Sequence, residues 1–485
     1  MKESNLSRRD LRYWVIWVGI LGVVLANFVA ARDDWLPEGL TPEGVYTLGV
    51  AWLMAWWWMG SRLPMAVAAL APLALFPFMG VLSAQQVAAP YSDKMVMLLL
   101  CGFLLALAVE KWGLHRRVAL MVLIKVGRSP GGLLAGVMAI TASMSMWISN
   151  TATTLMMLPI VLALVASCRV ENSDDKSNMF FAQSMLLALA YSASIGGLAT
   201  PVGTPPNLLF QGIYSEHFPQ AQEIGFGDWM LLGLPVALSM LFITWLLLTR
   251  YLLPVPADYK LGDRSALTER LSLLGGMSVA EKRVAVGFAI TCFLWVFRKQ
   301  IGLPSTVHDS TIAAAMAIIF FLYPSGDSDR PQLLEWEDAK ALPWGLLLLF
   351  GGGIALSKAF EASQLTAYLG GLLVSLGGLP TLVMVIGIAI SVTFLTEVTS
   401  NTATTSLILP VLAAASISAG LDPLLLMVPA TLAASCAFML PVATAPNAIV
   451  VGSGQVDQET MVRTGVYLNL IGVAPIAIVV MAMLA

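Results

Sequence analysis

Charged residues are scarce in this chain. Asp, Glu, Lys and Arg make up 11% of its 485 residues, whereas hydrophobic residues make up 58%. Soluble globular proteins carry about 25% charged residues, so this composition excludes a water-soluble enzyme and a disordered scaffold. The 26 Lys and Arg residues are outnumbered by 29 Asp and Glu residues. The chain therefore has no basic excess that would bind nucleic acid.

Metal-binding and nucleophilic side chains are also few. The cysteines and histidines are scattered along the chain (Cys101, Cys168, Cys292, Cys436, His115, His217 and His308). No CxxC pair and no HExxH motif occurs. Neither a metal centre nor a disulfide framework is indicated, and the nucleophile and base that a membrane-embedded hydrolase needs are not evident. We therefore predict no catalytic residues and no organic cofactor.

Long hydrophobic runs dominate the sequence instead. A helix that crosses a bilayer needs about 20 apolar residues. Eleven runs fit this description, at 13–31, 45–59, 63–82, 94–110, 182–212, 229–252, 284–300, 309–323, 343–360, 424–450 and 463–485. The first run has the basic flank of a signal peptide, but its length favours an uncleaved anchor. The sequence predicts an all-α polytopic membrane protein.

Two further apolar stretches, 131–167 and 364–418, are too long for one span and are broken by polar motifs. We interpret each as a re-entrant helical hairpin, which enters and leaves the bilayer on the same side. Basic loops at 111–128 and 250–283 alternate with acidic loops at 32–43 and 216–228. By the positive-inside rule, this pattern predicts a cytoplasmic N-terminus and an external C-terminus in the cell inner (plasma) membrane.

Arg298 and Lys299 fit this topology less well, because they lie near the outer end of the seventh span. The expected organisation is a tail and first transmembrane helix (1–44), a first repeat (45–252), a cytoplasmic interfacial linker (253–283) and a second repeat (284–485).

Two motifs recur in the same order in both halves. The hexad SNTATT occupies 149–154 and again 400–405, and a proline follows each copy at the same distance, so the offset is 251 residues. PVGTPPN at 201–207 corresponds to PVATAPN at 441–447. An internal duplication explains this order. Because five spans separate the hairpins, the halves are expected to be inverted repeats, as in many secondary transporters.

These motifs predict a binding site for charged ligands. Prolines that break a helix leave free carbonyls on one side and free N–H groups on the other. Carbonyl and hydroxyl oxygens suit a hard cation, and N–H groups at a helix start suit an anion. The alternative is that small polar residues only join helices together. The pairing of both motifs favours the binding site.

Basic residues are missing where the motifs lie. No Lys or Arg occurs in 130–167, 178–248 or 360–461. If the ligand is an anion, its charge must be balanced by helix dipoles, by a co-bound cation such as Na⁺, or by a basic residue from elsewhere. Glu397 is the acidic residue closest to either SNT motif. It is either a structural hydrogen-bond acceptor or a residue near a cation site.

The second half also contains a longer pattern. Residues 435–450 read SCAFMLPVATAPNAIV, which resembles the signature S-x2-F-x2-P-V-A-x3-N-x-I-V of the divalent anion–sodium symporters. Paired SNT motifs are the hallmark of that family, whose members carry dicarboxylates, citrate or sulfate. The resemblance extends from about residue 45 to the C-terminus, and bacterial dicarboxylate members look most similar. It implies a homodimer with scaffold and transport domains and an elevator-type movement.

The resemblance also implies a set of ligand-binding residues. One Na⁺ site would use Ser145, Ser149, Asn150 and Gly203, and the other Thr396, Thr399, Asn401 and Ala443. The substrate would meet Ser149, Asn150, Thr151, Thr204, Pro205, Ser400, Asn401, Thr402 and Thr444. This chain departs from the family in two places. Thr204 stands where dicarboxylate carriers often have Ser, and Ala445 stands where Pro is common, so the substrate remains open.

The function predicted from these observations is Na⁺-coupled import of a C4-type dicarboxylate such as succinate, malate or fumarate, with at least two Na⁺ sites. The alternatives are a sulfate or tricarboxylate symporter and a Na⁺-independent dicarboxylate exchanger. An exchanger is expected to carry basic side chains near its site, which the sequence does not show. A hydrolase or a channel is the alternative from another class.

Overall fold

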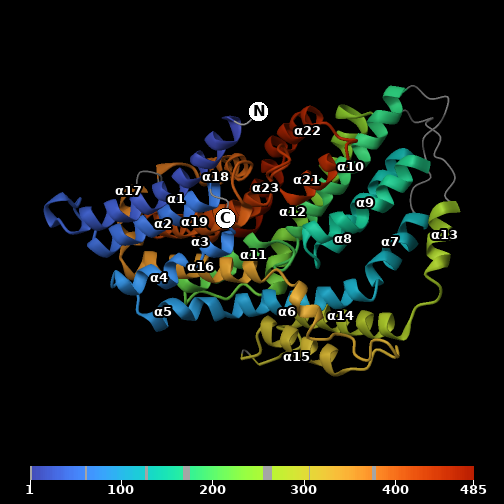
Figure 1. Ribbon diagram of the computed structural model, residues 1–485, viewed down its shortest axis with the longest axis horizontal. Coiled ribbons are helices and arrows are strands. Elements are labelled where there is room, and N and C mark those ends of the chain that lie inside the picture. The colour runs from blue at the N-terminus through green and yellow to red at the C-terminus, as the bar shows by residue number, and fades with distance from the viewer. Residues whose placement is uncertain are drawn as a thin grey trace.

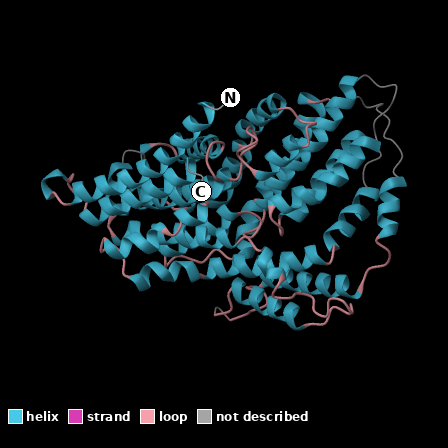
Figure 2. Ribbon diagram, viewed as in Figure 1, coloured by secondary structure: helices cyan, strands magenta, loops and turns pink. Residues whose placement is uncertain are grey.

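The computed structural model describes residues 3–60, 63–125, 129–167, 175–254, 265–304, 306–373 and 378–485. Within these ranges the regular elements are helices, and the only β-type pairing is an isolated bridge between Pro324 and Gln332. Figure 2 shows this helical architecture. The prediction of an all-α chain is therefore confirmed for the described residues.

The first half of the chain begins with α1 (Glu3–Ala30), η1 (Asp33–Trp35), α2 (Pro42–Gly60), α3 (Met65–Ala68), α4 (Ala71–Phe78), α5 (Ala84–Ala88) and η2 (Ala89–Ser92). It continues through α6 (Lys94–Lys111), α7 (Leu114–Lys125), α8 (Pro130–Ser145), α9 (Asn150–Ser167), α10 (Asp175–Gly197), α11 (Pro205–His217), α12 (Phe226–Leu246) and η3 (Leu247–Leu252).

The second half begins with α13 (Ser265–Leu273), α14 (Val279–Phe297), α15 (Asp309–Leu322), η4 (Asp338–Ala341), α16 (Trp344–Ala362) and α17 (Leu365–Leu373). It ends with α18 (Thr381–Thr396), α19 (Asn401–Ala419), α20 (Leu424–Ala434), α21 (Ala445–Gly452), α22 (Gln458–Ile471) and α23 (Val473–Leu484). In Figure 1, α1 and α2 lie together at one end, and α14 and α15 lie beside α6 along one edge.

Apolar surface supports a membrane location. Among the described residues, six helices are long and apolar enough to cross a bilayer, and seven further apolar helices are shorter. Large hydrophobic side chains also face outward, and on α1 Trp17 is 62% exposed and Phe28 is 50% exposed. Extended exposed apolar surface of this kind marks contact with a membrane or a partner. The number of spans, eleven, stays a prediction.

Two expected spans are interrupted by irregular backbone. The run 182–212 contains α10 and α11, which are separated by residues 198–204. The run 424–450 contains α20 and α21, which are separated by residues 435–444. Pro205 and Pro446 stand in the first turn of α11 and α21. Proline lacks an N–H group, so the first turn of a helix is the place where it costs no helical hydrogen bond.

Each SNT motif lies at the turn between two helices. Helices α8 and α9 are joined by residues 146–149, and α18 and α19 are joined by residues 397–400. The range expected for the second hairpin, 364–418, also contains α17, which packs against α19. The helix that pairs with α19 across the motif begins only at Thr381, directly after Pro380.

The core is built from several apolar clusters. The largest joins residues of the two hairpins, α10, α12, α20, α22 and α23. A second joins α6 to α14, α15 and α16, and a third joins α2–α5 to α16. The two hairpins and the two broken helices therefore share much of one core, although they are far apart in sequence.

The basic residues Arg298 and Lys299 meet acidic partners. Arg298 forms an ion pair with Asp309 (3.4 Å), and Lys299 forms one with Asp228 (2.5 Å). Glu223 contacts His308 Nε2 (3.1 Å) and also pairs with Lys94. The hydrogen bond from His308 and the charge of Lys94 lower the pKa of Glu223 to about 2. These ion pairs neutralise the charges of Arg298 and Lys299. They explain why two basic residues lie beside the acidic loop 216–228.

Part of the expected linker 253–283 can be described. Residues 255–264 lie outside the described residues. Beyond them, the linker range contains α13, a turn at 274–278 and the first residues of α14. Arg117 on α7 holds this turn. Its guanidinium bonds to both carboxylate oxygens of Glu281 (2.9 and 3.1 Å) and donates to the Gly275 carbonyl (2.8 Å). Both side chains of the ion pair are about nine-tenths buried.

This buried ion pair gives a testable stability difference. Arg117→Met leaves the Glu281 carboxylate buried without its cation, which typically costs about 3–5 kcal/mol. The double variant R117M/E281Q removes that charge and keeps an amide oxygen for the Ser278 N–H. We expect the double variant to unfold at a higher temperature than R117M in detergent. A double variant as unstable as R117M would contradict this account of Arg117.

Candidate functional site

The four recurring motifs meet around one cavity of about 450 Å³. The first half contributes residues 149–151 and 202–205, and the second half contributes 398–402 and 442–446. The other lining residues are apolar and come from other helices; together they are called the apolar wall (Trp58, Met65, Leu99, Phe103 and Leu346). Segments about 250 residues apart in the sequence thus line one space.

The structure brings the sequence-predicted residues together. All of the predicted substrate-binding residues line this cavity, as do Gly203, Thr399 and Ala443 from the predicted Na⁺ sites. The remaining two, Ser145 and Thr396, are fully buried behind the SNT motifs. Among the lining residues there is no Lys or Arg. The roles of the individual residues stay predictions.

An oxygen-rich group lies behind the first motif. Ser145 Oγ is 2.7 Å from Asn150 Oδ1. The same end of the Asn150 amide lies 3.1 Å from the Ala193 carbonyl oxygen and 3.3 Å from that of Gly203. If the amide nitrogen of Asn150 points to these groups, it donates to the carbonyls of Ala193 and Gly203. If the amide oxygen points to them, four oxygens converge: those of the Ser145 hydroxyl, the Asn150 amide and the two carbonyls. Neutral and carboxylate oxygens are the ligands that hard cations take, so the donor set fits Na⁺.

The second motif repeats this arrangement. Thr396 Oγ1 donates to Asn401 Oδ1 (2.7 Å) and lies 2.9 Å from the Ala434 carbonyl oxygen. Thr396 and Asn401 stand 251 residues after Ser145 and Asn150. The Thr399 hydroxyl bonds within its own hairpin, to Leu395 O (2.8 Å) and Thr404 Oγ1 (2.5 Å). Its role in the second Na⁺ site stays a prediction.

Two buried asparagines hold the broken helices in shape. Asn207 Nδ2 donates to the carbonyls of Gly197 (3.0 Å) and Thr200 (2.8 Å). Asn447 Nδ2 donates to the equivalent carbonyls, 240 residues later, of Ala437 and Leu440 (3.1 Å each). Sequence reasoning assigned no role to either asparagine. Their recurrence at the last position of both proline-rich motifs was the available signal.

These loops leave the starts of two helices facing the cavity. Thr204 and Thr444 precede α11 and α21 with extended backbone angles, and both line the cavity. Pro205, Pro206 and Pro446 carry no N–H group, and the N–H groups of Asn207 and Asn447 donate to Thr204 O (3.2 Å) and Thr444 Oγ1 (3.3 Å). Both helix starts therefore supply mainly the positive potential of the helix dipole. The cavity therefore offers anion-binding groups without a basic side chain.

The two halves differ at two glycines. A Cβ atom at Gly203 would lie 2.6 Å from the Gly197 carbonyl oxygen, and one at Gly197 would lie 2.8 Å from Asn150 Oδ1. The equivalent residues of the second half are Ala437 and Ala443. The first oxygen group is therefore more tightly built than the second.

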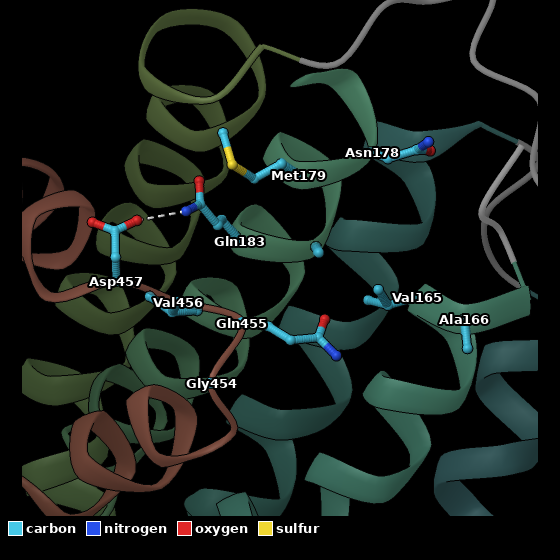
Figure 3. A pocket seen from close by; sticks show the side chains of 10 residues that line it. Val165, Ala166, Asn178, Met179, Gln183, Gly454, Gln455, Val456 and Asp457 are labelled. Carbon is cyan, nitrogen blue, oxygen red and sulfur yellow. Dashed lines mark hydrogen bonds between the residues drawn. The ribbon is translucent and has the colours of Figure 1, made fainter. Parts of the chain in front are cut away.

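A larger cavity, of about 900 Å³, lies elsewhere. It is formed by the end of α9, the start of α10 and the turn before α22 (Figure 3). Gln183 Nε2 bridges it by donating to Asp457 Oδ2 (2.7 Å). None of the predicted site residues lines it. The recurring motifs and the larger cavity therefore lie at different places in this protein.

Comparison with known proteins identifies the family. The sequence model described as the sodium:sulfate symporter transmembrane region matches residues 20–484. The chain belongs to this family. It is 41% identical to the sodium-dependent dicarboxylate transporter SdcS of Staphylococcus saprophyticus, over 95% of this chain and 90% of the relative. It is also 41% identical to SdcS of Staphylococcus aureus strain bovine RF122, over 95% of this chain and 89% of the relative.

Solved structures of transporters share the fold. Neisseria gonorrhoeae MtrF, described among antimetabolite efflux pumps, superposes with a TM-score of 0.60 at 12% identity, over 96% of this chain and 94% of that chain. The Alcanivorax borkumensis YdaH transporter gives a TM-score of 0.57 at 14% identity, over 96% of each chain. The chain is thus an all-helical, multi-pass membrane protein with a transporter fold. Its relatives are transporters and not enzymes, as the sequence predicts.

The glycine difference predicts unequal effects of two matched substitutions. Gly203→Ala places a methyl group against the Gly197 backbone and displaces an oxygen of the first group, whereas Ala443→Gly only removes a methyl group from the second. Displacing a supporting contact of a cation site costs about 10–100-fold in affinity or activity. We expect G203A to reduce Na⁺-dependent uptake by at least about tenfold, and A443G to stay within about threefold of the unsubstituted protein. Equal effects of the two variants would contradict the asymmetry.

Proposed function

We propose that this protein couples Na⁺ entry to the import of a C4-type dicarboxylate such as succinate, malate or fumarate. The observation that carries this proposal is the convergence of both SNT motifs and both broken helices on one cavity that has oxygen groups for cations and helix starts for an anion. The relatives named sodium-dependent dicarboxylate transporters support it.

The repeated motifs suit a ligand with two anionic ends. One carboxylate would meet residues 149–151 with Thr204 and Pro205 at the start of α11. The other would meet residues 400–402 with Thr444 at the start of α21. Hydroxyl and amide groups donate to carboxylates, and the positive potential at the starts of both helices attracts them. Each half of the protein would then recognise one end of the substrate.

Two Na⁺ ions would balance the two negative charges. One would bind Ser145, Ser149, Asn150 and Gly203, and the other Thr396, Thr399, Asn401 and Ala443. Because the described lining residues include no Lys or Arg, the cations supply the missing positive charge. Na⁺ binding first would order the two hairpin tips and complete the anion site. Movement that requires both ligands would prevent leakage of Na⁺ alone.

The proposed architecture follows the family resemblance. The protein would be a homodimer in the inner membrane, with its N-terminus in the cytoplasm and its C-terminus outside. The two halves would be inverted repeats, and a transport domain holding both hairpins would move against a scaffold domain in an elevator-type step. The cavity supports this division, because its polar side comes from the hairpins and broken helices and its apolar wall comes from α2, the segment around Met65, α6 and α16.

A sulfate symporter is the second candidate. The description of the matching family names sulfate, and the threonine at 204 and the alanine at 445 reshape the cavity relative to the usual dicarboxylate pattern. A panel of unlabelled sulfate, citrate and C4 dicarboxylates, used as competitors of labelled succinate, separates these substrates.

Transport in reconstituted vesicles tests the coupling directly. An inward Na⁺ gradient should accumulate labelled succinate above its external concentration, because the Na⁺ gradient supplies the driving force. The same vesicles with K⁺ or choline in place of Na⁺ should show only background uptake. Equal accumulation in all three salts would exclude Na⁺ coupling and favour an exchanger.

Substitution of the motif asparagines tests the site. Asn150→Ala and Asn401→Ala each remove the amide that joins a hairpin tip to its oxygen group. We expect both variants to lose uptake at normal expression. Asn27→Ala serves as the matched control, because Asn27 bonds only locally on α1, to Val23 O. Uptake retained by either motif variant would remove that half from the site.

A further inference from the structure

Glu397 is a buried carboxylate at the tip of the second hairpin. It follows Thr396 directly, precedes the SNT motif by three residues, and is 2% exposed. Its oxygens accept hydrogen bonds from three consecutive backbone N–H groups of the second broken helix, those of Phe438 (2.7 Å), Met439 (2.9 Å) and Leu440 (2.9 Å). Glu397 thus joins the hairpin tip to the loop that carries Ala443 and Thr444.

A fourth donor completes this environment. Asn469 Nδ2 on α22 donates to Glu397 Oε1 (2.7 Å). Among the described residues, no Lys, Arg or His side chain forms an ion pair with Glu397, although other acidic side chains have such partners. All four donors are N–H groups, which match the oxygens of a carboxylate, because these only accept hydrogen bonds. The carboxylate therefore stands next to Thr396 in the chain with hydrogen-bond donors but, among the described residues, without a cationic side-chain partner.

The first half makes the same junction without a charge. Met146 stands 251 residues before Glu397, and Thr200 stands 240 residues before Leu440. There the Thr200 hydroxyl donates to the Met146 backbone carbonyl. A neutral hydrogen bond thus replaces the carboxylate and its three N–H partners. The two oxygen groups, which share the same hydroxyl and asparagine pair, therefore sit in different electrostatic surroundings.

We propose that Glu397 is a positioning residue for the second cation site, and that its charge makes this the site that Na⁺ occupies at the lower concentration. The inference rests on the proposed Na⁺ coupling and adds an order to it. A negative charge in a low-dielectric interior attracts a nearby cation much more strongly than it does in water. Glu397 is not assigned as a ligand of the cation. It acts through its charge and by holding the loop and the hairpin that carry the ligands.

Thermal unfolding in detergent provides a readout that does not depend on transport. A ligand that binds only the folded state raises the unfolding temperature as its concentration rises. We would titrate Na⁺ against choline at constant ionic strength and read the Na⁺ concentration that gives half of the maximal shift. For Glu397→Gln we expect this concentration to rise about tenfold or more, which corresponds to ~1.4 kcal/mol. Glu397→Asp keeps the charge and should restore it to within about threefold of the unsubstituted protein.

Asp457→Asn is the matched control. Asp457 is a carboxylate that also accepts a backbone N–H, from Thr460 (2.7 Å), and a side-chain amide, from Gln183. It precedes α22, the helix that carries Asn469, but it lines the other cavity (Figure 3). We expect D457N to lower the unfolding temperature without Na⁺ and to leave the half-maximal Na⁺ concentration unchanged. A purely structural Glu397 would behave in the same way, and that result for E397Q would overturn the proposal.

A second pair of variants tests the order of occupancy without touching Glu397. Thr396→Val removes the hydroxyl of the second oxygen group, and Ser145→Ala removes that of the first. We expect the unfolding temperature of S145A still to rise at low Na⁺ concentration. We expect that of T396V to rise only at higher Na⁺ concentration. The opposite result would overturn the proposal even if E397Q fails to fold. If the unsubstituted protein shows no Na⁺-specific shift and no Na⁺-dependent uptake, the proposed function itself fails, and this inference fails with it.

Discussion

Interrupted helices inside an apolar protein are the constraint on which the rest of this structure depends. A break in a helix frees backbone N–H and carbonyl groups that lipid cannot satisfy. In this protein Asn207 and Asn447 donate hydrogen bonds to backbone carbonyls on one side of each break. On the other side of each break, α11 and α21 start at the cavity. The groups that remain free are the ones available to a ligand. The need to satisfy the backbone and the ability to bind ions thus have a common origin.

Much of this arrangement could be predicted from the sequence, because the signals were strong and local. The Pro-rich motifs predict broken helices, and a proline in the first turn of α11 and of α21 confirms where those helices restart. The repetition of SNT and of the Pro-rich motif predicted that distant segments act together. Family membership follows from the same residues. The start of α18 was missed, because α17 and α18 are both apolar and only Pro380 marks the boundary.

Other features depend on three-dimensional contacts that no local pattern shows. The Ala193 carbonyl approaches Asn150 and the Ala434 carbonyl approaches the Thr396 hydroxyl, yet an alanine carries no signal for this. Glu397 was evident as an acidic residue near a motif, but its three backbone donors lie about 40 residues further along the chain. The close approach of Gly197 and Gly203 is likewise a property of the folded loop. Sequence symmetry predicts which residues correspond, whereas packing decides how their surroundings differ.

The apolar wall of the cavity constrains the shape of whatever enters it. The motifs supply the polar lining, whereas Leu99, Phe103 and Leu346 have no side-chain hydrogen-bond donor, and the Trp58 indole N–H already donates to the Met65 carbonyl (3.2 Å). Placing charge against such a surface loses its hydration without replacement. A molecule with its charges at two ends and carbon between them satisfies both sides of the cavity. Under the proposed function, a compact ion with charge over its whole surface would satisfy only one, so the wall would act as a filter on how charge is distributed along a molecule.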